Sequence, residues 1–290
     1  MIKSKSTRTG DYIIASICLL LMFICLVPLL NVLARSLSST EALIRNEVLL
    51  WPKGWNIEAY KKVLSDSKYT FSLGWTAVLT AICTLVSMTL TILCAYPLIY
   101  HQLKGRKLIN GLIVLTMYFS AGIIPNYLLY KALGMLDKPV VLIVPNALSV
   151  FNMIILRSFF FGIPDSLRES AEIDGAGPIR ILIRIYLPLS TSVLATLSLF
   201  YAVGRWNGFT DALMFMLNNR RYHPIQLLLY NILQNATQIE VATQEGFFPP
   251  GLSETLKMAT VMFATVPIIL VYPWLQRYFI HGVTIGAIKG

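Results

Sequence analysis

Residues 161–189 read FGIPDSLRESAEIDGAGPIRILIRIYLPL, and they interrupt a sequence that otherwise avoids charge over long stretches. Five acidic or basic side chains lie between positions 165 and 174. Charged side chains are costly in hydrocarbon, so this segment must lie outside any membrane interior. The fold therefore depends on whether the apolar stretches around the segment are long enough to cross a membrane.

The whole chain is strongly apolar. Of its 290 residues, 56% are hydrophobic and 13% are charged, against roughly 45–50% and about 25% in soluble globular domains. A soluble domain of this size has no interior large enough to hide so much apolar surface. The composition therefore excludes a soluble enzyme, a disordered chain and a disulfide-stabilised secreted module.

Six charge-free windows have the length that a membrane-spanning helix needs, about 20 mostly apolar residues. They lack the period-two alternation of barrel strands, and only helices or closed barrels satisfy the backbone in lipid. The sequence predicts an all-α integral membrane protein in which a cytoplasmic N-terminus (residues 1–11) precedes a single transmembrane domain (12–290). The expected spans are about 12–34, 71–100, 108–130, 139–158, 187–213 and 258–279, and we expect the apolar stretch Ala212 to Leu217 to extend the fifth.

The net charge of +10 comes from 24 Lys and Arg against 14 Asp and Glu. The basic residues are scattered and form no run of five, so we expect them to meet anionic lipid headgroups rather than nucleic acid. They divide equally between the two sides of the membrane, and only their density favours cytoplasmic termini. The cysteines lie in apolar stretches without a CxxC pattern, which indicates neither a disulfide nor a metal site.

The charged segment itself predicts a short helix. Ser166 and Glu169 have the spacing of a capping box, in which each side chain bonds the other residue's backbone amide. Arg168 and Glu172 lie four residues apart and can form an ion pair on one helical face. An ordinary amphipathic connector on the headgroups would show the same features, so these residues alone leave its function open.

A sharp bend should follow this helix. Asp174-Gly175 predicts the end of the helix, because glycine tolerates the left-handed conformation found there. Gly177-Pro178 predicts the start of a second short helix, since proline suits the first helical turn. Pro188 then marks the start of the next span.

The order of these residues adds a family resemblance. Glu169-Ser170-Ala171, Asp174-Gly175-Ala176 and Leu187-Pro188 resemble the EAA signature of ABC importer permeases, with Ser170 in place of the usual first alanine. Three further elements resemble the carbohydrate-uptake class, specifically its maltose-permease-like second subunit and permeases of oligosaccharide and polysaccharide-fragment importers such as the alginate system. They are Trp206-Asn207-Gly208-Phe209, Tyr222-His223-Pro224-Ile225-Gln226-Leu227 and the glycine-rich tail 282–290.

The resemblance implies a type I ABC importer permease fold with a cytoplasmic coupling loop at 164–188. In such permeases this loop seats in an ATPase subunit, which places Glu169, Ser170, Ala171, Asp174 and Gly175 in the contact. The implied partners are a second homologous permease, two copies of an ATP-binding cassette ATPase, and an extracellular or periplasmic sugar-binding protein that meets segments 35–68 and 218–257. The implied location is the bacterial inner or plasma membrane, with both termini cytoplasmic.

The chain itself should not be an enzyme and should need no cofactor. It contains no Gly-Lys dipeptide and hence no phosphate-binding P-loop, so ATP and Mg²⁺ would be bound by the partner ATPases. Its three histidines fall in different segments, which predicts no metal site. An intramembrane protease would need paired catalytic groups that are missing. A stand-alone ion-coupled carrier or channel would need acidic residues within spans, and the windows have none.

A sugar pathway requires hydrogen-bonding groups and aromatic faces near the middle of the membrane. Tyrosine also belts membrane interfaces and asparagine also joins helices, so we expect only about one candidate in three to line a pathway. Arg205 and Asp211 should lie near the outer mouth, where a solvated helix end is the alternative. The pathway candidates are Tyr118, Asn126, Tyr127, Asn146, Asn152 and Asn207.

Overall fold

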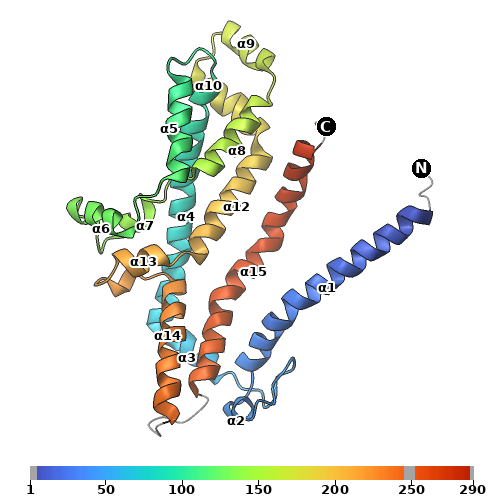
Figure 1. The fold of residues 1–290 in the computed structure, drawn as a ribbon, viewed down its shortest axis with the longest axis vertical. Helices are drawn as coiled ribbons and strands as arrows, with labels where there is room; N and C mark the ends of the chain where they lie inside the picture. The colour runs from blue at the N-terminus through green and yellow to red at the C-terminus, as the bar shows by residue number, and fades with distance from the viewer. Residues whose placement is uncertain (1–4, 245–251, 288–290) are drawn as a thin grey trace. The chain divides into compact units, whose positions relative to one another are not determined.

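The helices of the chain are seen in a computed structural model that describes residues 5–244 and 252–287, with side chains for 10–234 and 254–271 (Figure 1). All regular elements within these ranges are helical. The chain divides into two compact units. Unit 1 comprises residues 1–70 and 228–266, and unit 2 comprises 71–227 and 267–290.

Unit 1 begins with the long helix α1 (Lys5–Ser36). Apolar side chains on every side of α1 are exposed between Tyr12 and Leu33, as expected of a helix whose solvent is lipid. The short helices α2 (Thr40–Ile44) and α3 (Glu58–Ser65) follow, and the Ser39 hydroxyl caps α2 by accepting from the backbone of Ala42.

The helix α15 (Leu252–Ala287) packs against α3 within unit 1, where Ala59 and Val63 meet Ala259 in a small core. An ion pair between Arg35 and Glu254 joins the end of α1 to the start of α15. These contacts hold the membrane-flanking segment between α1 and α3 to a helix more than 190 residues away in sequence.

Unit 2 is built around α4 (Ser67–Ala95), α5 (Arg106–Tyr118), α8 (Val150–Phe161) and α12 (Thr191–Asn207), which run alongside one another in Figure 1. The hydrophobic core includes Leu156 of α8 and Leu197 of α12, both fully buried. At one end lie α9 (Asp165–Ile173), α10 (Pro178–Ile181), the π-helical turn η2 (Leu182–Tyr186) and α11 (Leu187–Leu189). At the other end lie α6 (Ile123–Ala132), α7 (Val140–Ile143) and α13 (Thr210–Phe215).

Three further elements lie within the described residues: the 3₁₀ turns η1 (Pro97–Ile99) and η3 (Arg220–Tyr222), and α14 (Ile225–Gln244). Trp75 and Ser72 of α4 donate hydrogen bonds to the carbonyls of Tyr222 and His223, which fixes the segment that leads into α14.

Three described stretches are single helices long and apolar enough to cross a membrane: Gly10–Ser36, Ser67–Ile99 and Glu254–Val271. The count rises to six if each of three sharply bent helix pairs is one span. The chain is thus an all-α membrane protein with several spans, as the sequence predicts, but its middle helices are broken.

The expected helix over 108–130 divides into α5 and α6 with a bend of 115°. The bend includes Gly122, whose φ of +85° favours glycine. The expected helix over 139–158 likewise divides into α7 and α8, with Pro145 between them. These breaks occur in apolar sequence, which charge patterning alone does not detect.

The expected fifth span also differs. α12 starts at Thr191 and ends at Asn207, and the apolar stretch Ala212 to Leu217 does not extend it. That prediction is wrong because Gly208 is extended and the chain turns back into the separate helix α13. A hydrogen bond from Arg205 to the Gly208 carbonyl stabilises the turn.

Candidate functional sites: the coupling elbow and a polar cavity

Residues 164–189, named here the elbow, begin with Pro164 and continue into α9. The helix starts at Asp165 and its N-cap, Pro164, makes no side-chain cap hydrogen bond. The predicted capping box is therefore wrong, because Ser166 lies inside the first turn instead of before it. Asp165 supplies a negative charge to the positive helix end, which favours this earlier start.

Arg168 holds α9 together and joins it to the rest of unit 2. Its guanidinium lies 3.3 Å from Asp165 and 3.4 Å from Glu172, which confirms the predicted i,i+4 pair. The same group lies 5.3 Å from the ring centroid of Tyr100, within cation–π range. Glu169 is 3.9 Å away and largely exposed, so its carboxylate remains available to another surface.

A cluster of buried aromatic rings packs between the elbow and the helices of unit 2. Tyr96, Tyr186 and Phe160 are buried and pack edge to face. The ring centroid of Tyr186 lies 5.3 Å from that of Tyr96 and 5.3 Å from that of Phe160. The Tyr96 hydroxyl donates to the Pro178 carbonyl at 2.9 Å and lies 2.5 Å from the hydroxyl of Tyr100. The ends of α4, α8 and η2 are thereby joined to α10, so a force on the elbow would reach all three.

The bend between α9 and α10 follows the prediction. Gly175 has φ of +78°, and the amide of Ala176 donates to the Ala171 carbonyl at 2.9 Å, a pattern that ends helices. Gly177 is the N-cap residue of α10 and Pro178 is its first residue. The elbow therefore has a defined corner and is not a free connector.

The elbow presents two faces. Ala171 and Ala176 pack against the core of unit 2, whereas Glu169, Ser170, Asp174 and Gly175 are exposed. Ala171 thus points toward its own unit and is the least suited of the five predicted contact residues to meet a partner. Sequence reasoning missed two exposed apolar side chains on the outer face, Ile173 (86% exposed) and Ile179 (73%).

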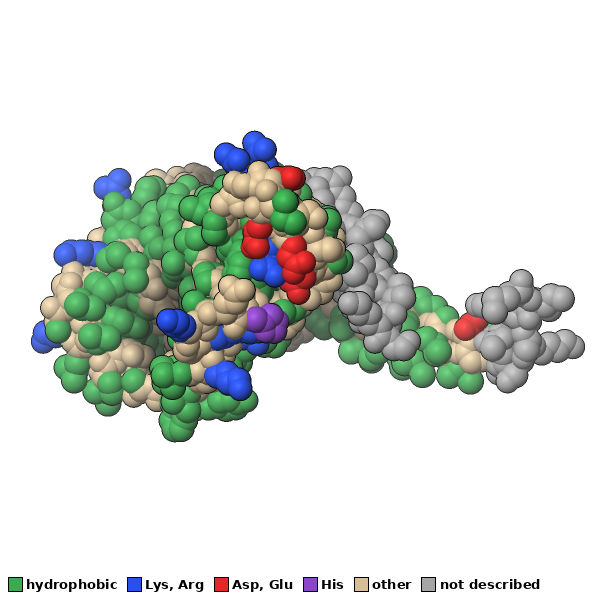
Figure 2. All heavy atoms as spheres, turned by 90° about the horizontal axis from the view of Figure 1, so that it is seen from above, with side chains coloured by type: hydrophobic (Ala, Val, Ile, Leu, Met, Phe, Trp, Pro, Cys, Tyr) green, Lys and Arg blue, Asp and Glu red, His purple; other side chains and the backbone are tan. Residues whose placement is uncertain are grey.

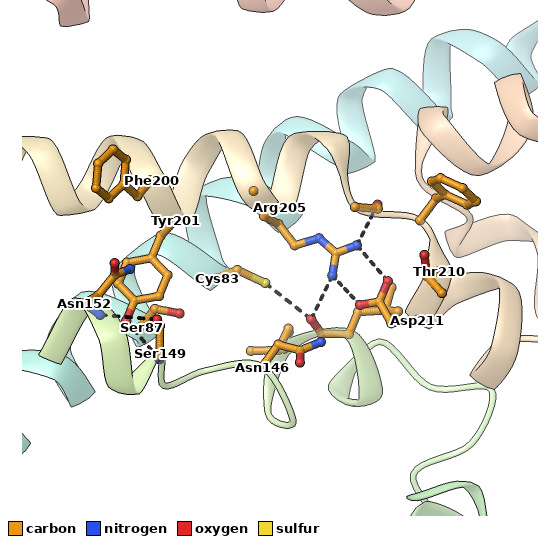
Figure 3. A pocket seen from close by; sticks show the side chains of 15 residues that line it. Cys83, Ser87, Asn146, Ser149, Asn152, Phe200, Tyr201, Arg205, Thr210 and Asp211 are labelled. Atoms are coloured by element: carbon orange, nitrogen blue, oxygen red, sulfur yellow. Dashed lines mark hydrogen bonds and ion pairs between the residues drawn. The ribbon is translucent and has the colours of Figure 1, made fainter. Parts of the chain in front are cut away.

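A second candidate site is a cavity of about 420 Å³ in unit 2 (Figure 3). Its wall comes from α4, α7, α8, α12 and the start of α13. The Tyr201 hydroxyl joins two of these helices, since it accepts from the Ser149 amide at 3.1 Å and lies 2.7 Å from the Thr91 hydroxyl. Hydrogen bonds thus fix part of the wall of this cavity, which combines apolar and polar side chains and has the size that small ligands need.

Arg205 and Asp211 form a buried ion pair in the cavity wall, with side chains only 8% and 12% exposed. Arg205 also donates to the carbonyls of Leu142 at 3.3 Å and Gly208 at 2.9 Å (Figure 3). The interpretation of these two residues as a solvated helix end is wrong, because the turn after α12 returns Asp211 to the helix it has just left. One guanidinium thus joins α7, α12 and α13.

The structure brings together two of the six predicted pathway residues. Asn146 and Asn152 line the cavity, and the buried Asn152 is the residue whose amide donates to Ser149. The others lie outside the lining: Tyr118 and Asn207 are exposed at helix ends, Asn126 is half-buried on α6, and Tyr127 packs on Phe215 with centroids 6.5 Å apart. Lining residues that sequence reasoning passed over are Ser87, Ser149, Tyr201 and Thr210.

A hydrogen-bonded clasp lies at the end of unit 2 that carries α6, α7 and α13. The Asp137 carboxylate accepts from the backbone and side-chain amides of Asn218 at 2.7 and 2.8 Å, and its own amide donates to the Phe215 carbonyl. The backbone amide of Asn218, followed by its side-chain amide, holds the pKa of Asp137 below its ordinary value. The clasp fixes the segments that flank the cavity.

In the part of the chain with described side chains, no three His, Cys, Asp or Glu groups lie close enough together to hold a metal ion. The Asp211 carboxylate is already paired with the guanidinium of Arg205.

Comparison with known proteins identifies the family to which a chain with this architecture belongs. A sequence profile described as "Binding-protein-dependent transport system inner membrane component" matches residues 87–285, which include the elbow and all of the cavity lining except Cys83. The chain belongs to this family. It is a membrane component of a transport system, and the family's permease subunits are the non-catalytic part of ABC importers, in agreement with the sequence analysis.

The matches to individual relatives cover nearly the full length of this chain. The polygalacturonan/rhamnogalacturonan transport system permease protein of Bacillus subtilis (strain 168) is 40% identical, over 98% of this chain and 99% of its own. The trehalose/maltose transport system permease protein of Thermococcus litoralis is 27% identical over 94% of each.

A solved structure shares the fold. The structure of a bacterial ABC transporter involved in the import of the acidic polysaccharide alginate matches with a TM-score of 0.85 and 29% identity, covering 96% of this chain and 99% of that one. The fold is that of a type I importer permease, as the EAA-like residues implied.

Proposed function

We propose that this chain forms half of the translocation pathway of an ATP-driven, binding-protein-dependent oligosaccharide importer. The observation that carries the proposal is the elbow: an exposed acidic and apolar surface set on a sharp corner that Tyr96 and Phe160 join to the ends of α4 and α8. The transport systems of the relatives, named for polygalacturonan, rhamnogalacturonan, trehalose, maltose and alginate, support a carbohydrate as the substrate.

In this proposal the elbow seats in a cytoplasmic ATPase subunit, with Glu169, Ser170, Asp174 and Gly175 at the contact beside Ile173 and Ile179. Closure of two ATPase copies would then move α4, α8 and α12 through Tyr96 and its neighbours. Such coupling requires that the contact differ between the open and closed states of the ATPase. ATP and Mg²⁺ would be bound by the ATPase subunits, and both termini of this chain would be cytoplasmic.

The polar cavity is the proposed sugar-contacting surface of this half. Asn146, Asn152 and Thr210 offer hydrogen-bond groups, and Phe200 and Phe209 offer aromatic faces, the combination that sugars require. A second, homologous permease would supply the other half of the pathway. An extracellular sugar-binding protein would deliver the substrate.

A stand-alone ion-coupled carrier is the alternative, and the structure gives it little support. Such a carrier needs a carboxylate free to bind the coupling ion within the membrane. Asp211 lies in the cavity wall, but both of its oxygens are bonded to Arg205.

The proposal is tested by purification and by transport. The chain should copurify with a second, different permease and two ATPase copies, and proteoliposomes holding the complex should take up labelled oligosaccharide only with ATP and the binding protein. An oligogalacturonide and a maltooligosaccharide serve as probes. Changing the P-loop lysine of the ATPase to alanine should stop uptake. Uptake that persists in that variant under an ion gradient would establish the stand-alone carrier.

A further inference from the structure

A group of basic side chains surrounds the start of α5, at the same end of unit 2 as the elbow. His101, Lys104, Arg106 and Lys107 come from the turn before α5 and from its first turn, and Arg157 comes from α8. Among the residues whose side chains are described, no acidic group lies within ion-pair distance of any of them. Figure 2 shows this face from above: the acidic side chains gather over α9, and a histidine lies beside Lys and Arg side chains.

The local geometry increases the positive potential. The first turn of α5 contains no acidic residue, although a helix N-terminus favours negative charge. Its N-cap is Gly105, with φ of +77° and no capping side chain. Arg106 and Arg157 both lie against the ring of Phe161, with guanidinium carbons 5.0 and 5.8 Å from its centroid. Two like charges thus share one ring, which lies where the start of α5 meets the end of α8.

A cavity opens at this point. It has a volume of about 530 Å³ and is lined by His101, Leu103, Gly105, Arg106, Lys107 and Asn110. The Arg106 guanidinium donates to Nδ1 of His101 at 3.0 Å, which leaves Nε2 of that ring as an N–H donor. Arg157 donates to the side-chain oxygen of Asn110, and its Nε is buried without a partner. Arg157 lies behind the lining, while His101, Arg106 and Lys107 supply N–H donors to the cavity, which no carboxylate lines.

We propose that this cavity binds the phosphate group of an anionic phospholipid. A phosphodiester supplies the negative charge that the cavity lining lacks, with acceptor oxygens for His101, Arg106 and Lys107, and basic pockets between membrane helices bind such headgroups. The lipid origin follows from α5 itself. Leu108, Leu112 and Leu115 lie on one face of the helix below the cavity and are 69%, 54% and 50% exposed, so an acyl chain has an apolar surface to follow.

The site is distinct from the proposed oligosaccharide pathway, and it lies beside the elbow. Phe161, which contacts both arginines, is the last residue of α8 and precedes α9 by four positions. A bound headgroup would neutralise the charge around this ring and fix the end of α8 from which the elbow starts. The lipid would therefore stabilise the elbow's position without taking part in transport chemistry.

Native mass spectrometry of the purified complex tests the proposal. The complex is exchanged into detergent with equal amounts of phosphatidylglycerol and phosphatidylcholine, and retained lipid is counted. The unchanged chain should retain phosphatidylglycerol preferentially. The Arg106→Gln/Lys107→Gln variant should reduce that preference by about 30-fold, which corresponds to about 1 kcal/mol for each charge removed.

Arg180→Gln/Arg184→Gln is the matched control, since it removes two exposed charges from the same end of unit 2 outside the cavity. The control should retain the preference. Equal loss in both variants, or no preference in the unchanged chain, would overturn the proposal. Inorganic phosphate at 1:1 with phosphatidylglycerol is the third arm: displacement of the lipid by it would identify a free-phosphate site and overturn the lipid assignment.

Discussion

Changing Arg205 to Met should destabilise the protein by about 3–5 kcal/mol, because it leaves the Asp211 carboxylate buried without its counter-ion. The same change removes the donors to the Leu142 and Gly208 carbonyls, so the turn between α12 and α13 loses its support. The measurement is denaturant or thermal unfolding of the purified complex in detergent. This is the largest stability effect that we expect from a single substitution.

Two comparisons separate this effect from general charge removal. The double variant Arg205→Met/Asp211→Leu removes both charges and should recover much of the lost stability, since no unpaired buried charge remains. Lys53→Met breaks the exposed pair with Glu47 and should change stability by less than about 1 kcal/mol. Equal effects of Arg205→Met and Lys53→Met would show that the Arg205–Asp211 pair is not buried in the working protein.

Changing Gly175 to Val should reduce ATP-driven uptake by about tenfold or more while membrane insertion remains intact. The φ of +78° at this corner costs an L-residue roughly 1–2 kcal/mol, and more for a β-branched side chain. No atom lies within 4 Å of the position that a Cβ would occupy, so backbone strain and not a clash is responsible. The elbow would relieve that strain by opening its corner. Uptake into proteoliposomes is the measurement.

Gly177→Val is the matched control for this prediction. Gly177 lies two residues away, also has open space around it, and has φ of −73°, which valine adopts freely. Uptake by this variant should stay within about twofold of normal, because valine before a proline prefers the extended region that Gly177 already occupies. If both variants transport equally well, the corner geometry is not part of coupling.

The sequence predicts the elbow better than the spans around it. Gly175 permits the left-handed backbone of the corner and Pro178 fixes the first turn of the second helix, so both can be located from local chemistry alone. Ser166 shows the limit of that approach: its spacing to Glu169 fits a capping box, but Pro164 and Asp165 start the helix earlier. Several neighbouring residues can each start a helix, and the sequence alone does not show which of them does.

Charge-free windows identify apolar helices but not their continuity. The bend at Gly122 occurs where every neighbour is apolar or polar without charge, so hydropathy passes through it unchanged. The turn at Gly208 lies between Arg205 and Asp211, whose charges do not show that the chain turns back there. The cavity depends on these breaks, because the turn after α12 places Asp211 against Arg205. Arg205 and Asp211 are six residues apart, and α12 ends between them. Until the turn that follows α12 is known, the sequence fits a solvated helix end as well as it fits a buried ion pair.

The central claim is that the elbow contacts a separate ATPase on the cytoplasmic side. Its most direct test uses a chain whose cysteines, Cys18, Cys25, Cys83 and Cys94, are replaced by serine, with one new cysteine at the exposed Ser170 or at the exposed Leu217 beyond α13. We predict that Ser170→Cys cross-links to the ATPase subunit and resists an impermeant maleimide added outside the cell, whereas Leu217→Cys is labelled and forms no such cross-link. Labelling of Ser170→Cys from outside, with no ATPase cross-link, would contradict the claim.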